Sequence, residues 1–454
     1  MPLSGIQIYK LLPQTNCKEC GFPTCLAFAM KLAAKQVELS SCPYVSEASK
    51  AQLAESATPP MRLVTIKADG NEVKAGNEVI LFRHEKTFYN RPGLFIRVSD
   101  SETADSIKAK LSPAEAFKVN YVGIELSVDG FAVESKSGNP GTFTTAVQTV
   151  RQVSHRPLIL ISRDPKVMAA GLQALPGEHP LMYTADASNW EAMADLAKQH
   201  QASLAVFAPT LDGLVDLTEK IKTKGVEDLV LDPAERVLGK WLVRSTQIRR
   251  LALKKNFRPL GYPLIAFPGE VDKAQPSEKD NPGREAIMAA QAIAKYAGFI
   301  VLDHFAPELL YPLLVLRQNI YTDPQKPIQV QPGLYEINSP KPEDPVLVTT
   351  NFSITYFSVA NEVEGSGLPA WLLVTDAEGM SVLTAWAAGK FDAERIAKAV
   401  KQFGVADRLS RKRIVLPGHV AVLSGEVEEE LPGWEIRVGP REAVDIPAFM
   451  KQVL

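Results

Sequence analysis

The sequence predicts a multidomain α/β protein with a small cysteine-bearing N-terminal domain, a central (β/α)8 barrel and a C-terminal open α/β sheet. Three observations support this fold class. All the cysteines lie between residues 17 and 42. Short Val/Ile/Leu runs then alternate with helical patterns from about residue 81 to residue 321. After a proline-rich stretch at 323–345, the α/β alternation begins again.

Composition excludes several classes of protein. The 454 residues include 50 basic and 52 acidic side chains, so the net charge of −2 does not favour nucleic acid as a partner. The sequence has no run of eighteen apolar residues, and its start, MPLSGIQIYKLLPQ, does not read as a signal peptide. Four cysteines are too few for a disulfide scaffold in so long a chain. We therefore expect a soluble, cytoplasmic protein with no membrane partner.

The cysteines Cys17, Cys20, Cys25 and Cys42 follow the spacing C-x2-C-x4-C-x16-C. Structural zinc prefers two pairs of close ligands, whereas here three cysteines cluster and the fourth stands alone. Three thiolates in a Gly/Pro-bearing loop with a remote fourth suit a 4Fe–4S cubane, in which each iron takes one cysteine. The glycine and proline keep the loop non-helical, which leaves backbone N–H groups for the sulfides. The pattern favours a 4Fe–4S cluster, with zinc, structural thiols and two disulfides as open alternatives.

Two changes in composition predict the domain boundaries. Residues 46–62 are small, polar and end in Pro-Pro, which is typical of a linker, and 323–345 contains six prolines, which is typical of an extended connector. We therefore expect a cluster domain at 1–60, a linker and barrel at 61–322, and a connector with the C-terminal domain at 323–454.

The central part predicts a TIM barrel because its apolar runs are continuous, as in parallel strands that are covered on both faces. Eight runs are enough for a closed barrel. The expected strands are 93–98, 122–128, 157–162, 180–184, 203–209, 228–233, 262–267 and 299–304. Asp232 and Asp303 end two of them, where barrel enzymes place catalytic residues, although aspartates at strand ends more often serve as helix caps.

The C-terminal part predicts a small Rossmann-like sheet with strands at 346–352, 370–376, 381–386, 413–418 and 434–440 and a helix at 392–404. Glycine-containing segments at 375–386, 416–420 and 438–442 follow or end these strands. In an open α/β sheet, ligands bind beyond the carboxyl ends of the strands, so these loops could form a pocket for a large, amide-rich ligand. Glycine-ended strands also occur in ordinary turns.

Seven stretches carry a resemblance to a known family: NCKECGFPTCLAFAMKLA, SSCPY, LFRHEKTFY, RQNIYTDPQ, VTTNFSITYFSV, GMSVLTAWAAGKF and VGPREA. Over all the expected parts, the chain resembles the large (gamma) subunits of the corrinoid/iron–sulfur proteins of the anaerobic acetyl-CoA (Wood–Ljungdahl) pathway. The resemblance implies a 4Fe–4S domain, a TIM barrel and a Rossmann-like, corrinoid-binding C-terminal domain.

The resemblance also implies a function. In this family a bound cob(I)amide accepts a methyl group from methyltetrahydrofolate on a separate methyltransferase and donates it to the nickel site of acetyl-CoA synthase. The 4Fe–4S cluster serves to return oxidised Co(II) to Co(I). The implied partners are a small subunit in a heterodimer, with the corrin between the two chains, the methyltransferase, CO dehydrogenase/acetyl-CoA synthase, and a reductive activator or ferredoxin. The cobalt carries the chemistry, so no catalytic side chain is expected.

Site residues follow from the same resemblance. It places Met380, Ser381, Val382, Leu383 and Thr384 under the corrin, with Thr384 nearest the cobalt. The other residues implied to contact the corrinoid are Thr350, Tyr356, Gly439, Pro440, Arg441 and Ala443.

The sequence lacks the D-x-H-x-x-G motif that supplies a lower axial histidine in many cobalamin proteins, since His419 has Pro417 two residues before it. A base-off corrinoid is therefore expected. The alternative function is that of a cluster-bearing electron-transfer subunit of a barrel enzyme without corrinoid, and a third possibility is a zinc-stabilised scaffold.

Overall fold

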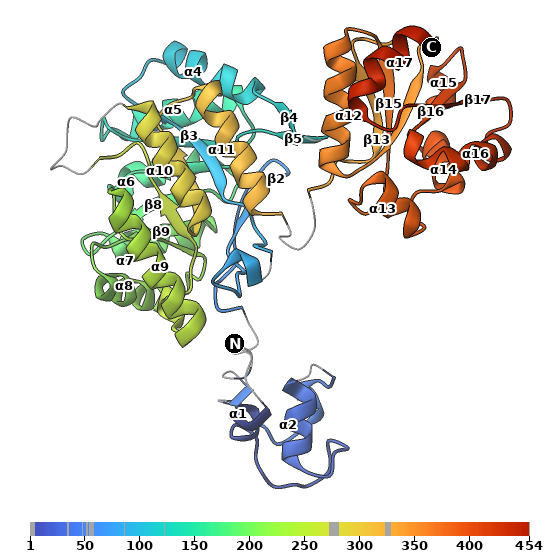
Figure 1. The fold of residues 1–454 in the computed structure, drawn as a ribbon. Coiled ribbons are helices and arrows are strands. Elements are labelled where there is room, and N and C mark those ends of the chain that lie inside the picture. The colour runs from blue at the N-terminus through green and yellow to red at the C-terminus, as the bar shows by residue number, and fades with distance from the viewer. Residues whose placement is uncertain are drawn as a thin grey trace. The chain divides into compact units, whose positions relative to one another are not determined.

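The computed structural model describes residues 5–33, 36–47, 49–50, 53, 59–85, 87–121, 123–271, 281–322 and 328–453 (Figure 1). The chain divides into two units: Met1–Phe117 with Ser127–Tyr321, and Lys118–Leu126 with Thr322–Leu454. Much of the expected linker at 46–62, and the start of the expected connector at 323–345, lie outside the described residues. No helix in the described ranges is both long and apolar enough to cross a bilayer.

The N-terminal segment folds around a small core of its own. Its elements are α1 (Gly5–Tyr9), α2 (Cys25–Ala33) and the 3-10 helix η1 (Leu39–Ser41). Phe28 is fully buried between the helices, and Cys25 and Cys42 lie in the same apolar cluster. Two of the four thiols are therefore part of this small buried core.

The central part is a closed barrel of parallel strands in the order β10-β11-β12-β3-β6-β7-β8-β9, which confirms the expected barrel. The strands are β3 (Gly93–Ser99), β6 (Gly130–Glu134), β7 (Leu158–Ile161), β8 (Leu181–Ala185), β9 (Ser203–Phe207), β10 (Leu229–Asp232), β11 (Leu264–Ala266) and β12 (Ala297–Leu302). The helices are α4 (Ala104–Ala116), α5 (Pro140–Val153), α6 (Pro165–Gln173), α7 (Trp190–His200), α8 (Leu211–Thr223), α9 (Leu238–Lys255), α10 (Pro282–Ala294) and α11 (Pro307–Ile320), with the 3-10 helices η2 (Arg83–Glu85) and η3 (Arg258–Leu260).

Helix starts in the barrel follow local sequence signals. Asn139, Asp164 and Asn281 each accept a hydrogen bond from the first turn of α5, α6 and α10, and each precedes a proline at the first helical position. These caps satisfy N–H groups that a helix start otherwise leaves without a partner.

An antiparallel hairpin closes the amino-terminal end of the barrel. It consists of β1 (Val64–Ala68) and β2 (Asn71–Ala75). Gly93 and Gly298 lie near the amino ends of β3 and β12, and a Cβ on them would lie 2.8 Å from Val73 Cγ1 and 2.6 Å from Ala75 Cβ. Side chains from the hairpin join the interior core of the barrel. The carboxyl-terminal end is therefore the end that remains for ligand cavities.

The prediction of a barrel strand at 122–128 is wrong. Its described part forms β5 (Ile124–Leu126), which pairs antiparallel with β4 (Val119–Tyr121) in a hairpin that belongs to the second unit. The barrel strand is β6, a few residues later. The sequence Ile-Glu-Leu-Ser-Val alternates apolar and polar residues, as a half-exposed hairpin does, whereas Gly-Phe-Ala-Val is continuous, as a barrel strand requires.

The second unit is an open five-stranded sheet in the order β13-β15-β14-β16-β17, parallel except for β13 at one edge. The strands are β13 (Gly333–Ile337), β14 (Val346–Thr350), β15 (Ala370–Thr375), β16 (Arg413–Leu416) and β17 (Glu435–Val438). The helices are α12 (Ser353–Ser366), α13 (Val382–Ala387), α14 (Ala393–Gln402), α15 (Val405–Arg408), α16 (Ser424–Glu430) and α17 (Ile446–Val453), with η5 (Gly418–Leu423) and η6 (Ala443–Asp445).

Two sequence expectations for this unit are corrected. Residues 381–386 were expected as a strand, but residues 382–386 lie in α13, because the buried Val382 and Ala385 are three residues apart, as on one face of a helix, and the Ala385 N–H donates to Ser381 O. The fifth strand is β13, which lies inside the expected extended connector and pairs antiparallel with β15. An edge strand between prolines is permitted, because prolines outside it remove no ladder hydrogen bond.

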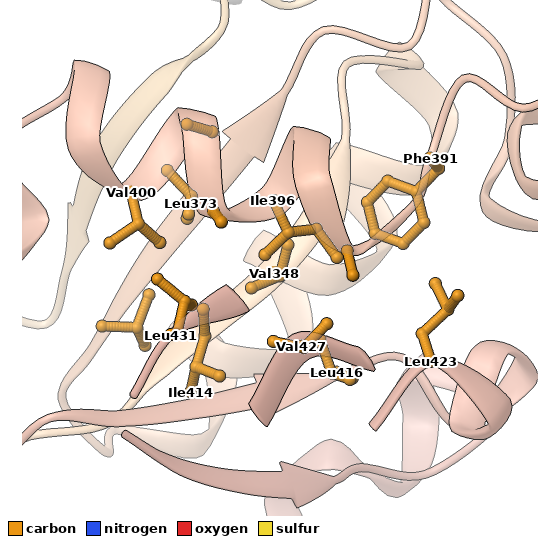
Figure 2. Packing of buried hydrophobic residues seen from close by; sticks show 14 of the residues in the cluster. Val348, Leu373, Phe391, Ile396, Val400, Ile414, Leu416, Leu423, Val427 and Leu431 are labelled. Atoms are coloured by element: carbon orange, nitrogen blue, oxygen red, sulfur yellow. The ribbon is translucent and has the colours of Figure 1, made fainter. Parts of the chain in front are cut away.

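Alternate residues of the central strands pack on opposite faces of the sheet. Val348, Leu373 and Ile414 face a core formed with α14 and α16, where Ile396 and Val427 pack between the layers (Figure 2). Neighbouring strand residues face a second core with α12 and α17. Full burial of such a side chain contributes about 1.5–3 kcal/mol, so helices on both faces hold the sheet rigid and fix its carboxyl edge.

Candidate functional site

The cysteine loop has an unusual backbone. Gln14, Asn16, Lys18 and Gly21 have φ values of 60°, 51°, 65° and 81°, so left-handed residues recur through the loop. Among the described residues, no hydrogen-bond acceptor is paired with the N–H groups of residues 17–20. Successive N–H groups in such turns form concavities that bind anions and iron–sulfur sites. The loop therefore offers N–H donors as well as thiols.

Asn16 and Cys25 bind each other in both directions. The Cys25 N–H donates to Asn16 Oδ1 over 2.8 Å, and the Asn16 N–H donates to Cys25 Sγ over 3.4 Å. This pair fixes the first residue of α2 against the loop that carries the other cysteines.

The four thiols differ in exposure. Cys25 and Cys42 are 6% and 5% exposed, Cys20 is half-buried and Cys17 is exposed. Within the described ranges, no three His, Cys, Asp or Glu side chains are already gathered around a metal position. An all-thiol donor set with free loop N–H groups nevertheless suits an iron–sulfur cluster by its chemistry.

The second unit has a cavity of about 350 Å³ at the carboxyl end of its sheet. It lies where β14, β16 and β17 end, between α12 and α13, which is the usual ligand position in an open α/β sheet. The lining residues are Leu347, Val348, Thr349, Ile354, Thr355, Ser358, Val359, Ser381, Val382, Leu383, Val415, Leu416, Pro417, His419, Gly439, Pro440, Arg441, Glu442, Ala443 and Ile446.

Two threonines at the end of β14 have unsatisfied hydroxyl groups. Thr349 Oγ1 and Thr350 Oγ1 are buried and have no hydrogen-bond partner among the described residues, and Thr349 lines the cavity. A buried polar group without a partner costs about 1–3 kcal/mol. A ligand with amide groups would supply a partner for the Thr349 hydroxyl at the cavity, so this residue suits an amide-rich ligand.

Two backbone loops form one wall of the cavity. Gly418 N–H donates to Pro440 O over 3.0 Å, and Gly439 N–H donates to Leu416 O over 2.8 Å. A Cβ on Gly418 would lie 2.5 Å from Gly439 O, so only glycine permits this approach. The close approach at Gly418 fixes the two loops against each other, and Pro417, His419, Gly439, Pro440 and Arg441 from them line the cavity.

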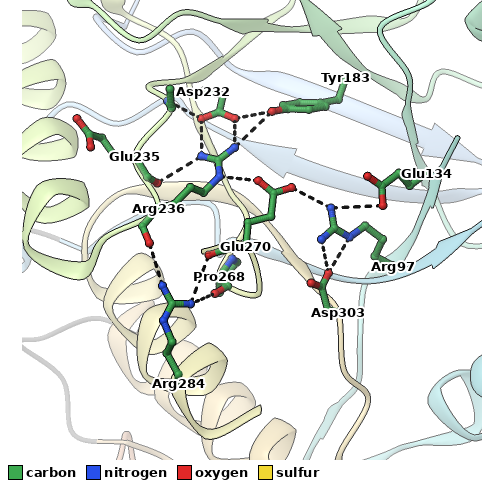
Figure 3. Close-up of polar contacts among 11 residues, drawn as sticks. Arg97, Glu134, Tyr183, Asp232, Glu235, Arg236, Pro268, Glu270, Arg284 and Asp303 are labelled. Carbon is green, nitrogen blue, oxygen red and sulfur yellow. Dashed lines mark hydrogen bonds and ion pairs between the residues drawn. The ribbon is translucent and has the colours of Figure 1, made fainter. Parts of the chain in front are cut away.

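The carboxyl-terminal end of the barrel carries a network of ion pairs (Figure 3). Glu270 binds Arg97 over 2.9 Å and Arg236 over 2.6 Å, and Arg236 binds Asp232 over 2.8 Å. The hydroxyl of Tyr183 donates to Asp232 over 2.7 Å. Burial raises the pKa of Tyr183, and the Asp232 carboxylate raises it further, so the phenol stays protonated.

The same network holds the other aspartate that the sequence singled out. Arg97 Nη2 lies 2.6 Å from Asp303 Oδ1. Burial alone lowers the pKa of Arg97, but the carboxylates of Asp303, Glu134 and Glu270 raise it above its usual range. Cavities of about 620 and 730 Å³ lie beside the network. Its carboxylates are engaged by arginines, which favours a structural role for both aspartates.

Two family models match this sequence. One, described as "CO dehydrogenase/acetyl-CoA synthase delta subunit", matches residues 63–450, and another, described as "Putative Fe-S cluster", matches residues 12–44. The corrinoid/iron–sulfur protein large subunit of Moorella thermoacetica is 44% identical over 451 residues, which is 99% of each chain. The chain belongs to the corrinoid/iron–sulfur protein large-subunit family.

Further relatives carry the name acetyl-CoA decarbonylase/synthase complex subunit gamma. The protein of Archaeoglobus fulgidus is 34% identical, covering 99% of this chain and 98% of that one, and the protein of Methanopyrus kandleri is 35% identical with the same coverage. Among solved structures, dihydropteroate synthase from Thermus thermophilus aligns with a TM-score of 0.39 at 15% identity, covering 57% of this chain and all of that one. The relatives confirm the family resemblance drawn from the sequence.

In this corrinoid/iron–sulfur family member, the expected corrinoid contacts divide into two groups. The cavity is lined by Ser381, Val382, Leu383, Gly439, Pro440, Arg441 and Ala443. Thr350, Tyr356, Met380 and Thr384 do not line it. Tyr356 packs against Tyr335, with ring centroids 5.3 Å apart, and Thr384 is exposed on α13 with Oγ1 3.0 Å from Ser381 Oγ.

Several lining residues were not named from the sequence. Thr349, Thr355 and Ser358 place hydroxyl-bearing side chains at the cavity, and Glu442 lies 3.8 Å from His419 Nε2. The signal was present in VTTNFSITYFS, where Thr355 and Ser358 are spaced i, i+3 and share one helix face. The sequence alone does not show that this helix face lies toward the carboxyl ends of the strands, so the two residues could not be assigned to the cavity from it.

Proposed function

We propose that the protein is a methyl carrier that holds a corrinoid at the carboxyl end of its C-terminal sheet and a 4Fe–4S cluster in its N-terminal segment. The observation that carries the proposal is the cavity between α12 and α13, lined by the unsatisfied hydroxyl of Thr349, in a chain 44% identical over its length to a corrinoid/iron–sulfur protein large subunit. The proposed domains are 1–60 for the cluster, 61–322 for the linker and barrel, and 323–454 for the connector and corrinoid domain.

The proposed cluster ligands are Cys17, Cys20, Cys25 and Cys42. Support comes from the all-thiol donor set, from the N–H groups of residues 17–20 that lack partners within the described chain, and from the Fe–S family model over residues 12–44. Hydrogen bonds to the sulfurs and burial tune the potential of such a cluster. Buried Cys25 and Cys42 would shield one side of it from water.

When bound in the cavity, a corrinoid would supply a cobalt nucleophile that can take up and release a methyl group. The hydroxyl of Thr349 would donate a hydrogen bond to one of its amide oxygens. Gly439 in the cavity lining permits close approach of the ligand, and Leu383 offers apolar cover. Thr350, Met380, Tyr356 and Thr384 stay proposed contacts on the evidence of the resemblance, and the missing D-x-H motif supports a base-off state.

The proposed partners are a small subunit, a methyltetrahydrofolate methyltransferase, CO dehydrogenase/acetyl-CoA synthase, and a reductive activator or ferredoxin. Relatives named as subunits of an acetyl-CoA decarbonylase/synthase complex support this. Exposed apolar side chains on the second unit, among them Ile354 at 65% and Val422 at 69%, are also consistent with a surface that another molecule covers.

A cavity-filling variant tests the proposal. Ser358 lines the cavity from an exposed position on α12, so Ser358→Trp should fill the site without disturbing a core. In protein purified anaerobically with its accompanying small subunit, cobalt should fall several-fold while iron and acid-labile sulfide stay at wild-type content. Glu364→Trp, exposed on the same helix but away from the cavity, is the matched control and should keep its cobalt. A wild-type protein that has iron and sulfide but no cobalt would support the electron-transfer alternative instead.

A further inference from the structure

A tight turn connects β15 to α13 immediately before the residues of α13 that line the cavity. Glu378 and Gly379 have φ values of 54° and 74°, and the Met380 N–H donates to Ala377 O over 3.0 Å. The turn leads directly into Ser381, Val382 and Leu383, which line the cavity. The position of these residues therefore depends on what holds the turn.

Asn351 holds it. The residue follows β14 directly and is 1% exposed. Its Oδ1 accepts hydrogen bonds from the N–H groups of Ala377 over 2.9 Å and Gly379 over 3.0 Å. Its Nδ2 donates to Asp376 Oδ1 over 3.2 Å and to Gln329 Oε1 over 3.4 Å.

The chemistry of this position requires a carboxamide. The turn presents two N–H donors on one side and a carboxylate on the other, so the residue must accept and donate at once. Aspartate would keep the acceptors but would place its charge beside Asp376, and alanine would leave the two N–H groups without their partner. One side chain thus links the end of β14, where Thr349 and Thr350 lie, to the segment that enters the cavity.

We propose that Asn351 is a positioning residue for the ligand of this cavity, because it fixes the 376–380 turn and so sets the place of Ser381–Leu383. The inference rests on the proposed corrinoid function. It assigns Asn351 no contact with the corrinoid.

The test compares Asn351→Ala with a structural control in the same unit. Asn338 is also an asparagine whose side chain bonds to backbone: its Nδ2 donates to Val363 O over 3.0 Å and Leu368 O over 2.9 Å, and neither partner lines the cavity. Both variants lose side-chain hydrogen bonds to backbone. Only Asn351→Ala should raise the rate of amide hydrogen exchange across 376–383. The same variant should bind added hydroxocobalamin about tenfold more weakly, or weaker still, whereas Asn338→Ala should bind it as the wild type does.

A double substitution keeps the test valid if Asn351→Ala does not fold. Asn351→Asp alone should weaken hydroxocobalamin binding. Combined with Asp376→Asn, it restores one donor opposite one acceptor and should recover part of the affinity, although the Glu378 N–H loses Asp376 Oδ1 as its acceptor.

Two results would overturn the assignment. One is wild-type affinity in Asn351→Ala or Asn351→Asp despite fast exchange in the turn. The other is equal weakening by Asn338→Ala, which would mean that general loss of stability explains the effect. If the wild-type complex binds no hydroxocobalamin, the proposed function itself fails, and that result is distinct from both.

Discussion

Asn16 shows how one side chain can shape a cluster site before any cluster is present. It takes a left-handed conformation, which asparagine tolerates better than most residues, and its side chain holds the first N–H of α2. Its own N–H meets Cys25 Sγ. Such N–H to sulfur hydrogen bonds stabilise the more negatively charged, reduced state of a cluster.

Asn16→Ala should therefore shift the midpoint potential of the cluster to a more negative value, because the N–H to Cys25 sulfur is no longer held in place. Gln14→Ala is the matched control: Gln14 is also left-handed, but its side chain donates to Tyr9 O over 3.3 Å and, within the described ranges, to no cysteine. Redox titration followed by electron paramagnetic resonance measures both. An unchanged potential in Asn16→Ala at full iron content would contradict the role given to this residue.

Asp100 is a second residue whose protonation the structure predicts. It accepts hydrogen bonds from Ser135 Oγ, Lys136 N–H and both groups of Ser137, at 2.6–2.9 Å. Burial opposes its ionisation, but the hydrogen bonds from Ser137, Ser135 and Lys136 outweigh burial and lower the pKa of Asp100. Because the folded pKa lies below the unfolded one, the stabilisation is present above pH ~4 and is lost as pH falls through the folded pKa.

Asp100→Asn should destabilise the barrel by about 1–3 kcal/mol at pH 7, since the amide cannot accept all of these hydrogen bonds. The difference from wild type should shrink as pH falls from ~4 through the lowered folded pKa of Asp100, because the folded wild-type carboxyl becomes neutral only below that pKa. Urea unfolding at several pH values measures this, with the exposed Asp105→Asn as control. A difference that stays constant with pH would show that charge is not the cause.

At the scale of elements, continuous apolar runs predicted seven of the eight barrel strands, because buried parallel strands have a distinctive composition. The hairpin β4–β5 could not be recognised in this way. Its membership of the second unit depends on Tyr121 packing in that unit's core and on Gly123 lying beside Tyr335, and these contacts join residues far apart in the sequence. Likewise, α13 depends on the turn that Asn351 holds, which local propensity does not reveal.

Gly123→Ala tests whether the hairpin is fitted to the second unit. Its φ is +80°, and a Cβ would lie 2.3 Å from Tyr335 Oη and 2.9 Å from Gln331 Cβ. We expect a loss of about 1–3 kcal/mol from overpacking, in addition to the left-handed strain. Gly138→Ala has the strain alone, since φ is +65° and no atom lies within 4 Å of the added Cβ. The rate of amide hydrogen exchange in β13 should rise in Gly123→Ala only. Equal rates in both variants would contradict the close packing of the hairpin against Tyr335.

For the whole molecule, the cysteine spacing and the family stretches are the basis on which both cofactor sites are proposed, and seven of the eleven expected corrinoid contacts line one cavity. The sequence did not reveal the network of Arg97, Glu270 and Arg236 at the barrel mouth, because its members come from separate strands and loops. Asp232 and Asp303 belong to that network. Their positions at strand ends suggested a catalytic role, because the sequence alone does not show that arginines pair with them.

The two proposed cofactor sites should be separable. Cys42→Ala should lose cluster iron but keep cobalt, because the cavity in the second unit contains no residue of the N-terminal segment. Chemically reduced Cys42→Ala should still accept and donate methyl groups, while its reactivation by a protein electron donor should slow. Reactivation at the wild-type rate would contradict the role of the cluster, and loss of cobalt together with iron would contradict the separation of the sites.

We propose above that the corrinoid occupies the cavity at the carboxyl edge of the C-terminal sheet. Hydrogen exchange read by mass spectrometry, on the complex with and without bound corrinoid, locates the cofactor on the chain. We expect protection in the peptides that contain 347–359, 381–383, 415–419 and 439–446, with little change around Arg97, Glu270 and Arg236. Protection at the barrel mouth without protection of these four segments would place the cofactor elsewhere and would overturn the proposal.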